Sequence, residues 1–123
     1  MFKPAVTAVI PCHNHEKWVM QAVDSVVAQT YKVNKIIVVD DGSTDNSLQT
    51  VINSANCTEI YNVDGKAWYK GQRNNVKLEL YKNDKAYGPS YARNIGIKAG
   101  WNDTDIYALL DSDDLYKPDK IQK

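Results

Sequence analysis

Three carboxylates stand together near the end of the chain, at Asp111, Asp113 and Asp114, directly after the apolar run 106–110. Such a run is typical of a buried strand, and ligands of open α/β sheets bind outside the carboxyl ends of the strands. Crowded carboxylates repel one another unless a cation or hydrogen-bond donors compensate. A hard divalent ion carrying a phosphorylated ligand would do so, because it takes carboxylate and phosphate oxygens together. The alternative is a solvated acidic segment at a helix start before Pro118.

A second pair of carboxylates, Asp40 and Asp41, follows the β-branched run 35–39 in the same way. The segment 42–45, Gly-Ser-Thr-Asp, is typical of an ordinary turn and helix cap. That interpretation explains the turn but not the Asp pair. Two strands that end in carboxylates at the same edge of one sheet predict a polar site there.

Apolar periodicity predicts strands that alternate with helices. Strands are expected at 5–10 (stopped by Pro11), 35–39, 76–81 and 106–110, and helices at 18–29, 43–53 and 88–98. Trp18 is expected in the core, on the apolar stripe of the first helix. This alternation predicts an α/β fold with a Rossmann-like, mostly parallel sheet flanked by helices.

The pattern weakens between residues 57 and 75. Asp64-Gly65 suits a hairpin that protrudes from the sheet, and an unstructured insert is the alternative. Trp68 and Tyr69 are expected to form a small local cluster there, with exposure to a partner as the other possibility. The basic residues of this stretch are expected in a solvated loop; they are Lys66, Lys70 and Arg73.

Composition excludes several classes of protein. Fifteen basic and fifteen acidic residues balance, so no net field recruits nucleic acid or an anionic membrane. No run approaches the roughly 20 apolar residues of a transmembrane helix. Cys12 and Cys57 lack metal-type spacing and predict two free thiols in a reducing, cytoplasmic compartment.

Together these segments resemble the nucleotide-binding half of family 2 glycosyltransferases with the GT-A fold. The matching segments are Val9-Ile10-Pro11-Cys12-His13-Asn14, Ala28-Gln29-Thr30-Tyr31, residues 36–45, Asn83, residues 88–96, residues 110–114 and Pro118. Their order and spacing hold over nearly the whole chain except 57–75. Residues 1–123 are therefore expected to be the N-terminal, nucleotide-binding part of a GT-A domain, truncated after the last strand, with an insert at 57–75.

The resemblance implies transfer of a sugar from a nucleotide diphosphate donor, with a UDP-sugar favoured, to a hydroxyl of a glycan or other acceptor. Transfer in this family usually inverts the anomeric carbon. The resemblance also implies that Pro11, His13 and Asn14 lie along the nucleoside, with His13 near the base. Asp41 would accept a hydrogen bond from the uracil ring, with Asp40 beside it in the donor site.

Asp111 and Asp113 resemble the family's DxD motif. Asp113 would be the direct ligand of Mn²⁺ or Mg²⁺, and Asp111 would lie nearer the ribose and a metal-bound water. Such an ion stabilises the negative charge that grows on the departing diphosphate. Arg93 would brace the Asp40 side of the site, with a surface ion pair as the alternative.

The family's domain is normally longer, and its second half supplies the acceptor contacts and the general base. No base is evident here, because Asp103 and Asp105 precede the last strand and His15 is expected to be solvated. We expect a donor-binding half that transfers little sugar alone and self-associates through uncovered sheet edges.

Other classes of function fit the sequence less well. A non-catalytic nucleotide-binding module that acts through a partner is the alternative. A dinucleotide oxidoreductase is disfavoured because residues 11–16 lack a G-x-G-x-x-G fingerprint. A sugar-nucleotide pyrophosphorylase would need a Gly-rich, basic loop at the same place.

Overall fold

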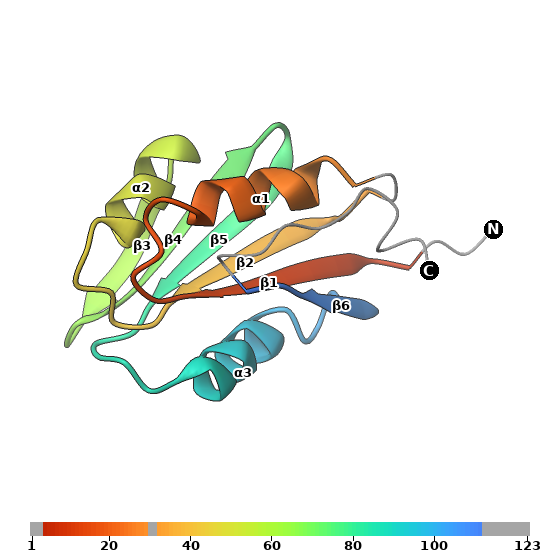
Figure 1. Cartoon of the computed structure of the whole chain (residues 1–123). Helices are drawn as coiled ribbons and strands as arrows, with labels where there is room; N and C mark the ends of the chain where they lie inside the picture. The colour runs from red at the N-terminus through yellow and green to blue at the C-terminus, as the bar shows by residue number, and fades with distance from the viewer. Residues whose placement is uncertain (1–3, 30–31, 112–123) are drawn as a thin grey trace.

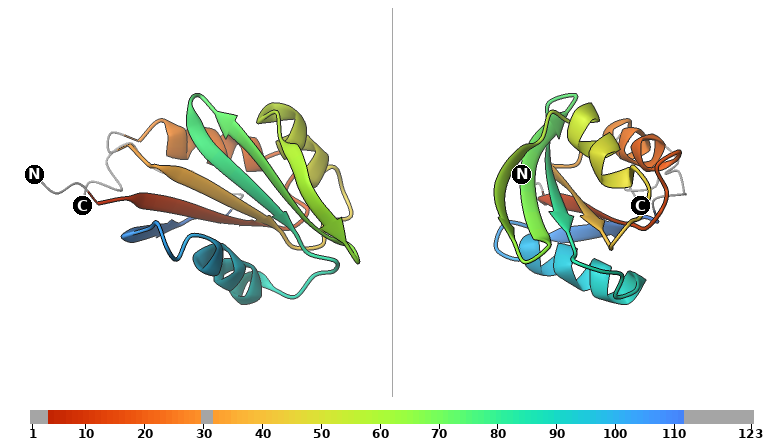
Figure 2. Two further views of the ribbon diagram at one scale, coloured as in Figure 1. Left: turned by 180° about the vertical axis from the view of Figure 1, so that it is seen from behind. Right: turned by 90° about the vertical axis from the view of Figure 1, so that its left-hand side faces the viewer.

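The computed structural model describes residues 4–29 and 32–111. Its elements are β1 (Val6–Cys12), α1 (Val19–Val27), β2 (Lys35–Asp40), α2 (Ser47–Ser54), β3 (Thr58–Val63), β4 (Lys66–Arg73), β5 (Val76–Lys82), α3 (Pro89–Ala99) and β6 (Ile106–Leu109). The strands form one sheet in the order β3-β4-β5-β2-β1-β6. Helices α1 and α2 cover one face of this sheet and α3 covers the other (Figure 1, Figure 2).

The middle of the sheet is parallel, because β2 pairs in parallel with β1 and β5, and β1 pairs in parallel with β6. Every residue of β1 and β2 is buried, as expected for strands covered on both faces. The larger core lies between the sheet and α1/α2, and a smaller one lies beneath α3. The predicted α/β class with a mostly parallel sheet flanked by helices is confirmed.

Strand β1 continues through Pro11 to Cys12, so the prediction that Pro11 stops it is wrong. Backbone groups of a parallel strand point alternately to its two neighbours, and Val9 faces β6, where its carbonyl accepts the N–H of Leu110. Pro11 faces the same side, beyond the last β1–β6 pair, Val9 with Leu109. Its missing N–H therefore costs the sheet no hydrogen bond.

Helix α1 buries the predicted stripe through Val19, Ala22, Val23 and Val26, but Trp18 is 46% exposed. Trp18 precedes the first helical residue, with ψ near −20°, and its ring contacts the edge of His15 at a centroid distance of 6.0 Å. The prediction that Trp18 belongs to the core is therefore wrong. The apolar spacing continues one residue before the helix, but the helix begins at Val19, so Trp18 does not share its buried face.

Residues 58–73 form a hairpin that enlarges the sheet, which is neither a protrusion nor an unstructured insert. Asp64 and Gly65 both have positive φ, as a two-residue type I′ turn requires, and β4 pairs with β5 along its length. Arg73 lies on β4 and binds the carboxylate of Asp24 at 2.8 and 3.1 Å, so the predicted solvated basic loop is wrong. Trp68 stacks on Tyr81 at 5.8 Å, whereas Tyr69 points to the other face of β4 and is buried in the larger core, so the predicted cluster of these two residues does not form.

Strand β6 lies at the edge of the sheet, with Ile106 47% and Leu109 44% exposed. The predicted strand at 106–110 is present as β6, but it is not buried, and in that run only Leu110, just beyond the strand, is buried. Both cysteines are free thiols, as predicted, and burial raises the pKa of Cys57 to about 11. Across residues 4–29 and 32–111, no helix has the length and apolar character needed to cross a membrane.

Candidate functional site

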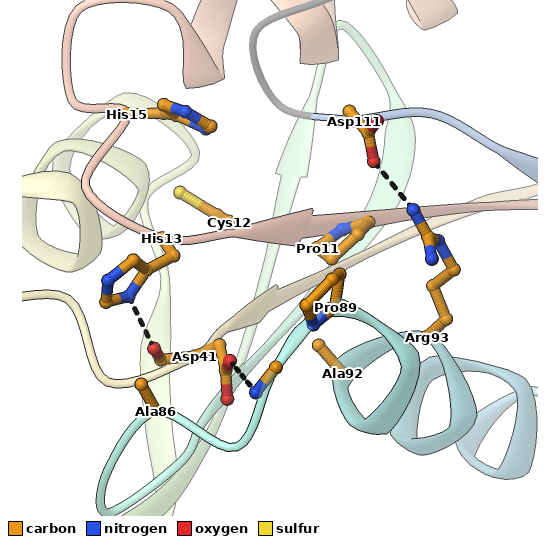
Figure 3. A pocket seen from close by; sticks show the side chains of 11 residues that line it. Pro11, Cys12, His13, His15, Asp41, Ala86, Pro89, Ala92, Arg93 and Asp111 are labelled. Atoms are coloured by element: carbon orange, nitrogen blue, oxygen red, sulfur yellow. Dashed lines mark hydrogen bonds and ion pairs between the residues drawn. The ribbon is translucent and has the colours of Figure 1, made fainter.

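A cavity of about 450 Å³ opens at the carboxyl ends of β1, β2 and β6 (Figure 3). The strands contribute residues at their carboxyl ends and just beyond them, and the first turns of α3 contribute the opposite wall. The lining residues are Pro11, Cys12, His13, His15, Asp41, Ala86, Gly88, Pro89, Ala92, Arg93 and Asp111. The two strand ends that carry carboxylates in the sequence thus meet at one site.

Asp41 is only 4% exposed, and its carboxylate accepts hydrogen bonds from three N–H donors. Its Oδ1 accepts hydrogen bonds from the side-chain amide of Asn83 at 2.7 Å and from the main-chain N–H of Tyr87 at 3.0 Å. Its Oδ2 accepts the main-chain N–H of Gly88 at 2.8 Å. Neutral donors therefore support a buried carboxylate at the cavity wall without cancelling its charge.

The loop 83–88 is shaped to deliver these donors. Gly42 has φ +65°, and a Cβ there would lie 2.4 Å from the backbone of Lys85 and Ala86, so the loop can close over it only if residue 42 is glycine. Gly88 has φ 104° and ψ 161°, a conformation that is essentially restricted to glycine. It turns the chain into Pro89, the first residue of α3.

Asp40 faces away from this cavity. By strand alternation its side chain shares a face with Ile36 and Val38, in the core beneath α1 and α2. Its Oδ2 accepts the N–H of Ser43 at 3.3 Å, and its Oδ1 has no partner among the described residues. Burial raises the pKa of Asp40. Asp40, expected in the donor site, is absent from the lining.

Two residues of the 11–14 segment have different surroundings. The Nδ1 of His13 lies 2.8 Å from the main-chain oxygen of Asp41, so this nitrogen donates the hydrogen bond. Asn14 does not line the cavity. Its Oδ1 accepts the main-chain N–H of Thr44 at 2.8 Å and thereby fixes the loop before α2.

His15, expected to be a solvated side chain, lines the cavity and is partly buried. Its main-chain N–H donates to the hydroxyl of Ser47 at 3.1 Å, and its ring contacts Trp18. These contacts tie the segment before α1 to the first residue of α2 and hold His15 at the cavity.

Arg93 lies one turn into α3 and donates to Oδ1 of Asp111 at 3.0 Å (Figure 3). It does not brace the Asp40 side, so that expectation is wrong, and the alternative of an ion pair describes its contact. The side chains are 33% and 52% exposed, so both remain accessible from the cavity. Asp113, Asp114 and Pro118 lie outside the described residues. Residues 4–29 and 32–111 contain no cluster of three potential metal ligands.

The family model of Glycosyl transferase family 2 matches residues 7–123 of this chain. The chain belongs to that family. It is 36% identical over 118 residues to an uncharacterized glycosyltransferase of Rickettsia felis and 30% identical over 123 residues to one of Haemophilus influenzae. These alignments cover 95% and 100% of the chain. The chain spans 16% and 42% of the length of these two relatives.

Solved structures with the same fold are GT-A glycosyltransferases. Mannosyltransferase PcManGT from Pyrobaculum calidifontis, in complex with GDP-Man and Mn²⁺, superposes with a TM-score of 0.76 at 21% identity, over 98% of this chain and 31% of that one. S. aureus TarS 1-349 in complex with UDP gives 0.70 at 23% identity, over 96% and 30%. These likenesses establish the fold.

In this family 2 chain, sequence reasoning missed several cavity residues. Most contribute backbone or small apolar surface, which leaves no chemical signal in a sequence; they are Ala86, Gly88 and Ala92. Asn83 entered only through the family resemblance, because a single Asn after a strand is also typical of a turn. Its contact with Asp41 becomes visible only when residues 42 positions apart are brought together.

Proposed function

We propose that the cavity binds the nucleotide of a UDP-sugar and that the protein transfers the sugar to an acceptor hydroxyl with inversion. The observation that carries this proposal is Asp41. A carboxylate has about four acceptor positions, and three of those on Asp41 are filled by Asn83, Tyr87 and Gly88. One position remains for a ligand N–H, and uracil offers one N–H between two carbonyl groups. UDP bound to TarS and GDP-Man bound to PcManGT support a nucleotide donor in the same fold.

The other lining residues suit the remaining parts of such a donor. Pro11 and His13 would flank the nucleoside, since they adjoin Asp41 at the base end of the cavity. The guanidinium of Arg93, on the opposite wall, would attract the diphosphate. Asp40 and Asn14 support the surrounding loops through Ser43 and Thr44.

Asp111 offers the kind of ligand that a divalent ion such as Mn²⁺ or Mg²⁺ prefers. This carboxylate is a hard oxygen ligand, half-exposed at the cavity wall, and Arg93 engages its Oδ1. We propose that Asp111 and Asp113 hold the ion together with the diphosphate. When bound, the ion would neutralise the charge that develops on the leaving diphosphate.

No general base is assigned to the described carboxylates. Asp41 is engaged by three donors and Asp111 by Arg93. Asp103 and Asp105 lie at the other end of the sheet, where they bind Lys35 and the N–H of Ala5. We therefore propose that residues 1–123 hold the donor, and that the acceptor hydroxyl is activated by residues outside the described part. Self-association stays a prediction.

Calorimetric titration of the chain with UDP, in Mn²⁺ and then in excess chelator, tests this proposal. We expect UDP to bind, and chelation to weaken it by about tenfold or more, since a metal-bridged diphosphate loses a charge-assisted contact. Asp111→Asn should lose most of the Mn²⁺ dependence. The matched control is Asp64→Asn, an exposed turn residue where Asn is equally suited to the type I′ turn.

The outcomes separate the parts of the proposal. Equal UDP affinity with and without Mn²⁺ would remove the metal. Tighter binding of NAD than of UDP would remove the donor assignment. Inversion is tested on a preparation active in transfer, by measuring the anomeric configuration of the product by NMR.

A further inference from the structure

We infer that Asn83 is a positioning residue that sets the nucleobase selectivity of Asp41, so that the site accepts uracil and disfavours guanine. This inference rests on the proposed function. Asn83 follows β5 directly, is 3% exposed, and is placed by its own main-chain N–H, which donates to the carbonyl of Asp40 at 2.9 Å. From there its side-chain amide reaches Oδ1 of Asp41 at 2.7 Å.

The two oxygens of Asp41 are unequally occupied. Oδ1 already accepts two hydrogen bonds, from Asn83 and from the N–H of Tyr87, which fills both of its lone pairs. Among the described residues, Oδ2 accepts one, from the N–H of Gly88, and keeps one position. The carboxylate can therefore take one further N–H donor, and only at Oδ2.

This count discriminates between nucleobases. Guanine presents two adjacent N–H donors, at N1 and N2, and pairs with a carboxylate through both oxygens. Uracil presents a single N–H and needs only one. With Oδ1 saturated, one of the guanine donors would be left without an acceptor in a buried site, which costs binding free energy.

Asn83 is the adjustable part of this arrangement. The donors from Tyr87 and Gly88 belong to the main chain and are present whatever side chains stand there. Of the donors that residues 4–29 and 32–111 supply to Asp41, only the Asn83 amide comes from a side chain. Removing it frees one lone pair of Oδ1 and loosens the orientation of the carboxylate.

Titrations of Asn83→Ala with UDP and with GDP, both in Mn²⁺, test the inference, because the two probes carry the same diphosphate. We expect UDP affinity to fall by about fivefold, because the carboxylate loses a donor that orients it, while GDP affinity holds or rises. The ratio of the two dissociation constants should shift toward GDP by about fivefold or more. Asn34→Ala is the matched control, since Asn34 bonds the N–H of Val6 at 2.8 Å at the other end of β1. It should leave the ratio unchanged.

Failure of the inference and failure of the proposed function give different results. A native chain that binds neither nucleotide defeats the proposed function. A native chain that binds UDP, with an unchanged ratio in Asn83→Ala, overturns the role of Asn83 alone. If Asn83→Ala does not fold, Asn83→Ser replaces it, and the same shift in ratio is expected. Failure of both variants to fold would make Asn83 a purely structural residue and overturn the inference.

Discussion

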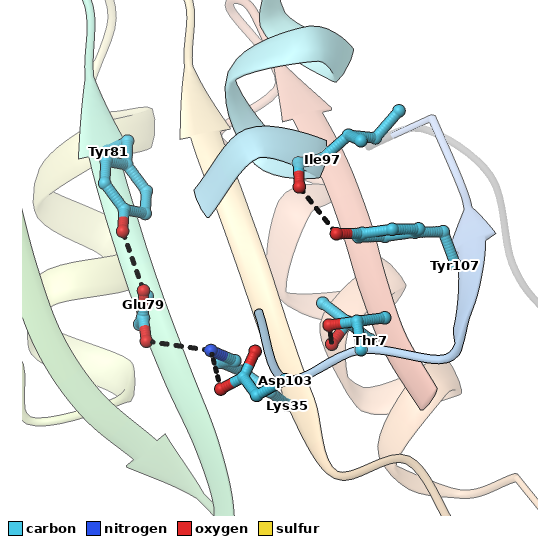
Figure 4. Close-up of polar contacts among 8 residues, drawn as sticks. Thr7, Lys35, Glu79, Tyr81, Ile97, Asp103 and Tyr107 are labelled. Atoms are coloured by element: carbon cyan, nitrogen blue, oxygen red, sulfur yellow. Dashed lines mark hydrogen bonds and ion pairs between the residues drawn. The ribbon is translucent and has the colours of Figure 1, made fainter. Parts of the chain in front are cut away.

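The two ends of the sheet each carry a charged cluster beside a cavity of similar volume, about 450 Å³ at Asp41 and about 440 Å³ at Lys35. At the Lys35 end the charges satisfy one another (Figure 4). Lys35 Nζ lies 3.3 Å from Glu79 and 3.0 Å from Asp103, and Glu79 also accepts the hydroxyl of Tyr81 at 2.8 Å. We call these four residues the closed cluster, because their charged and polar groups are paired with one another.

At the Asp41 end the buried charge is stabilised by hydrogen bonds and not by an opposite charge. Neutral N–H groups from one loop surround Asp41, so its negative charge is not cancelled by a cation. The nearby ion pair of Arg93 and Asp111 is partly exposed. Cavity volume therefore does not separate a binding site from a structural cluster. A binding site differs from a structural cluster in the number of hydrogen-bond acceptor and donor positions that stay open.

Asp41→Asn should have the largest effect. In either orientation its amide would direct N–H groups at a buried N–H donor of the loop 83–88, and the charge-assisted bonds would be lost. We expect the free energy of unfolding in urea to fall by about 3 kcal/mol, and UDP binding to disappear. Asp103→Asn, at a side chain 63% exposed, is the control and should cost under about 1 kcal/mol. Equal losses would erase the difference between the two ends.

Lys35→Met should destabilise the fold without changing nucleotide affinity. The Glu79 carboxylate, with its side chain 14% exposed, would lose its close cation. We expect a loss of about 2 kcal/mol in urea unfolding, and recovery of most of it in the double variant Lys35→Met/Glu79→Leu, because an apolar pair needs no compensation. UDP affinity should be unchanged. A large loss of UDP affinity would show that the closed cluster acts on the site.

Arg93→Gln should weaken nucleotide binding and leave the stability of the fold almost unchanged. Its partly exposed pair with Asp111 contributes under about 1 kcal/mol to stability. Removing the guanidinium should lower UDP affinity by about fivefold and leave the affinity for uridine, which lacks the diphosphate, unchanged. Calorimetry with both ligands measures this difference. Equal loss for uridine and UDP would move Arg93 away from the phosphates.

The smallest effect is a pH dependence of the closed cluster. Burial opposes the charged form of Lys35, but its hydrogen bond to Asp103 and the nearby charge of Glu79 prevail, so its pKa is raised above 10.5. A raised pKa stabilises the fold fully below the unfolded value, and this contribution is lost as pH rises through the folded value. In urea unfolding, the stability gap between the native chain and Lys35→Met should stay constant up to about pH 10 and narrow above it, as the pH passes the unfolded value and then the raised folded value. A constant gap would contradict the sign of the shift.

Several parts of the fold and site could be predicted from local pattern. The runs 35–39 and 106–110 become strands whose ends carry Asp41 and Asp111 to one cavity, because parallel strands of one sheet share a carboxyl edge. Gly88-Pro89 starts α3 as expected, since its backbone requirements are local. The hairpin turn at Asp64-Gly65 was likewise visible, but its pairing with β5 was not, because pairing depends on a distant strand.

The sequence by itself determined the alternation of strands and helices, the turns, and the placing of carboxylates after two strands, because each follows from neighbouring residues. Only the tertiary structure decided which carboxylate faces the cavity. Asp40 and Asp41 are adjacent and chemically identical, yet one lies beneath α1 and α2 and the other is enclosed by the loop 83–88. The physical reason is that burial, donors and counter-charges come from segments some 40 residues away, such as Asn83, which bonds Asp41 at a separation of 42 residues.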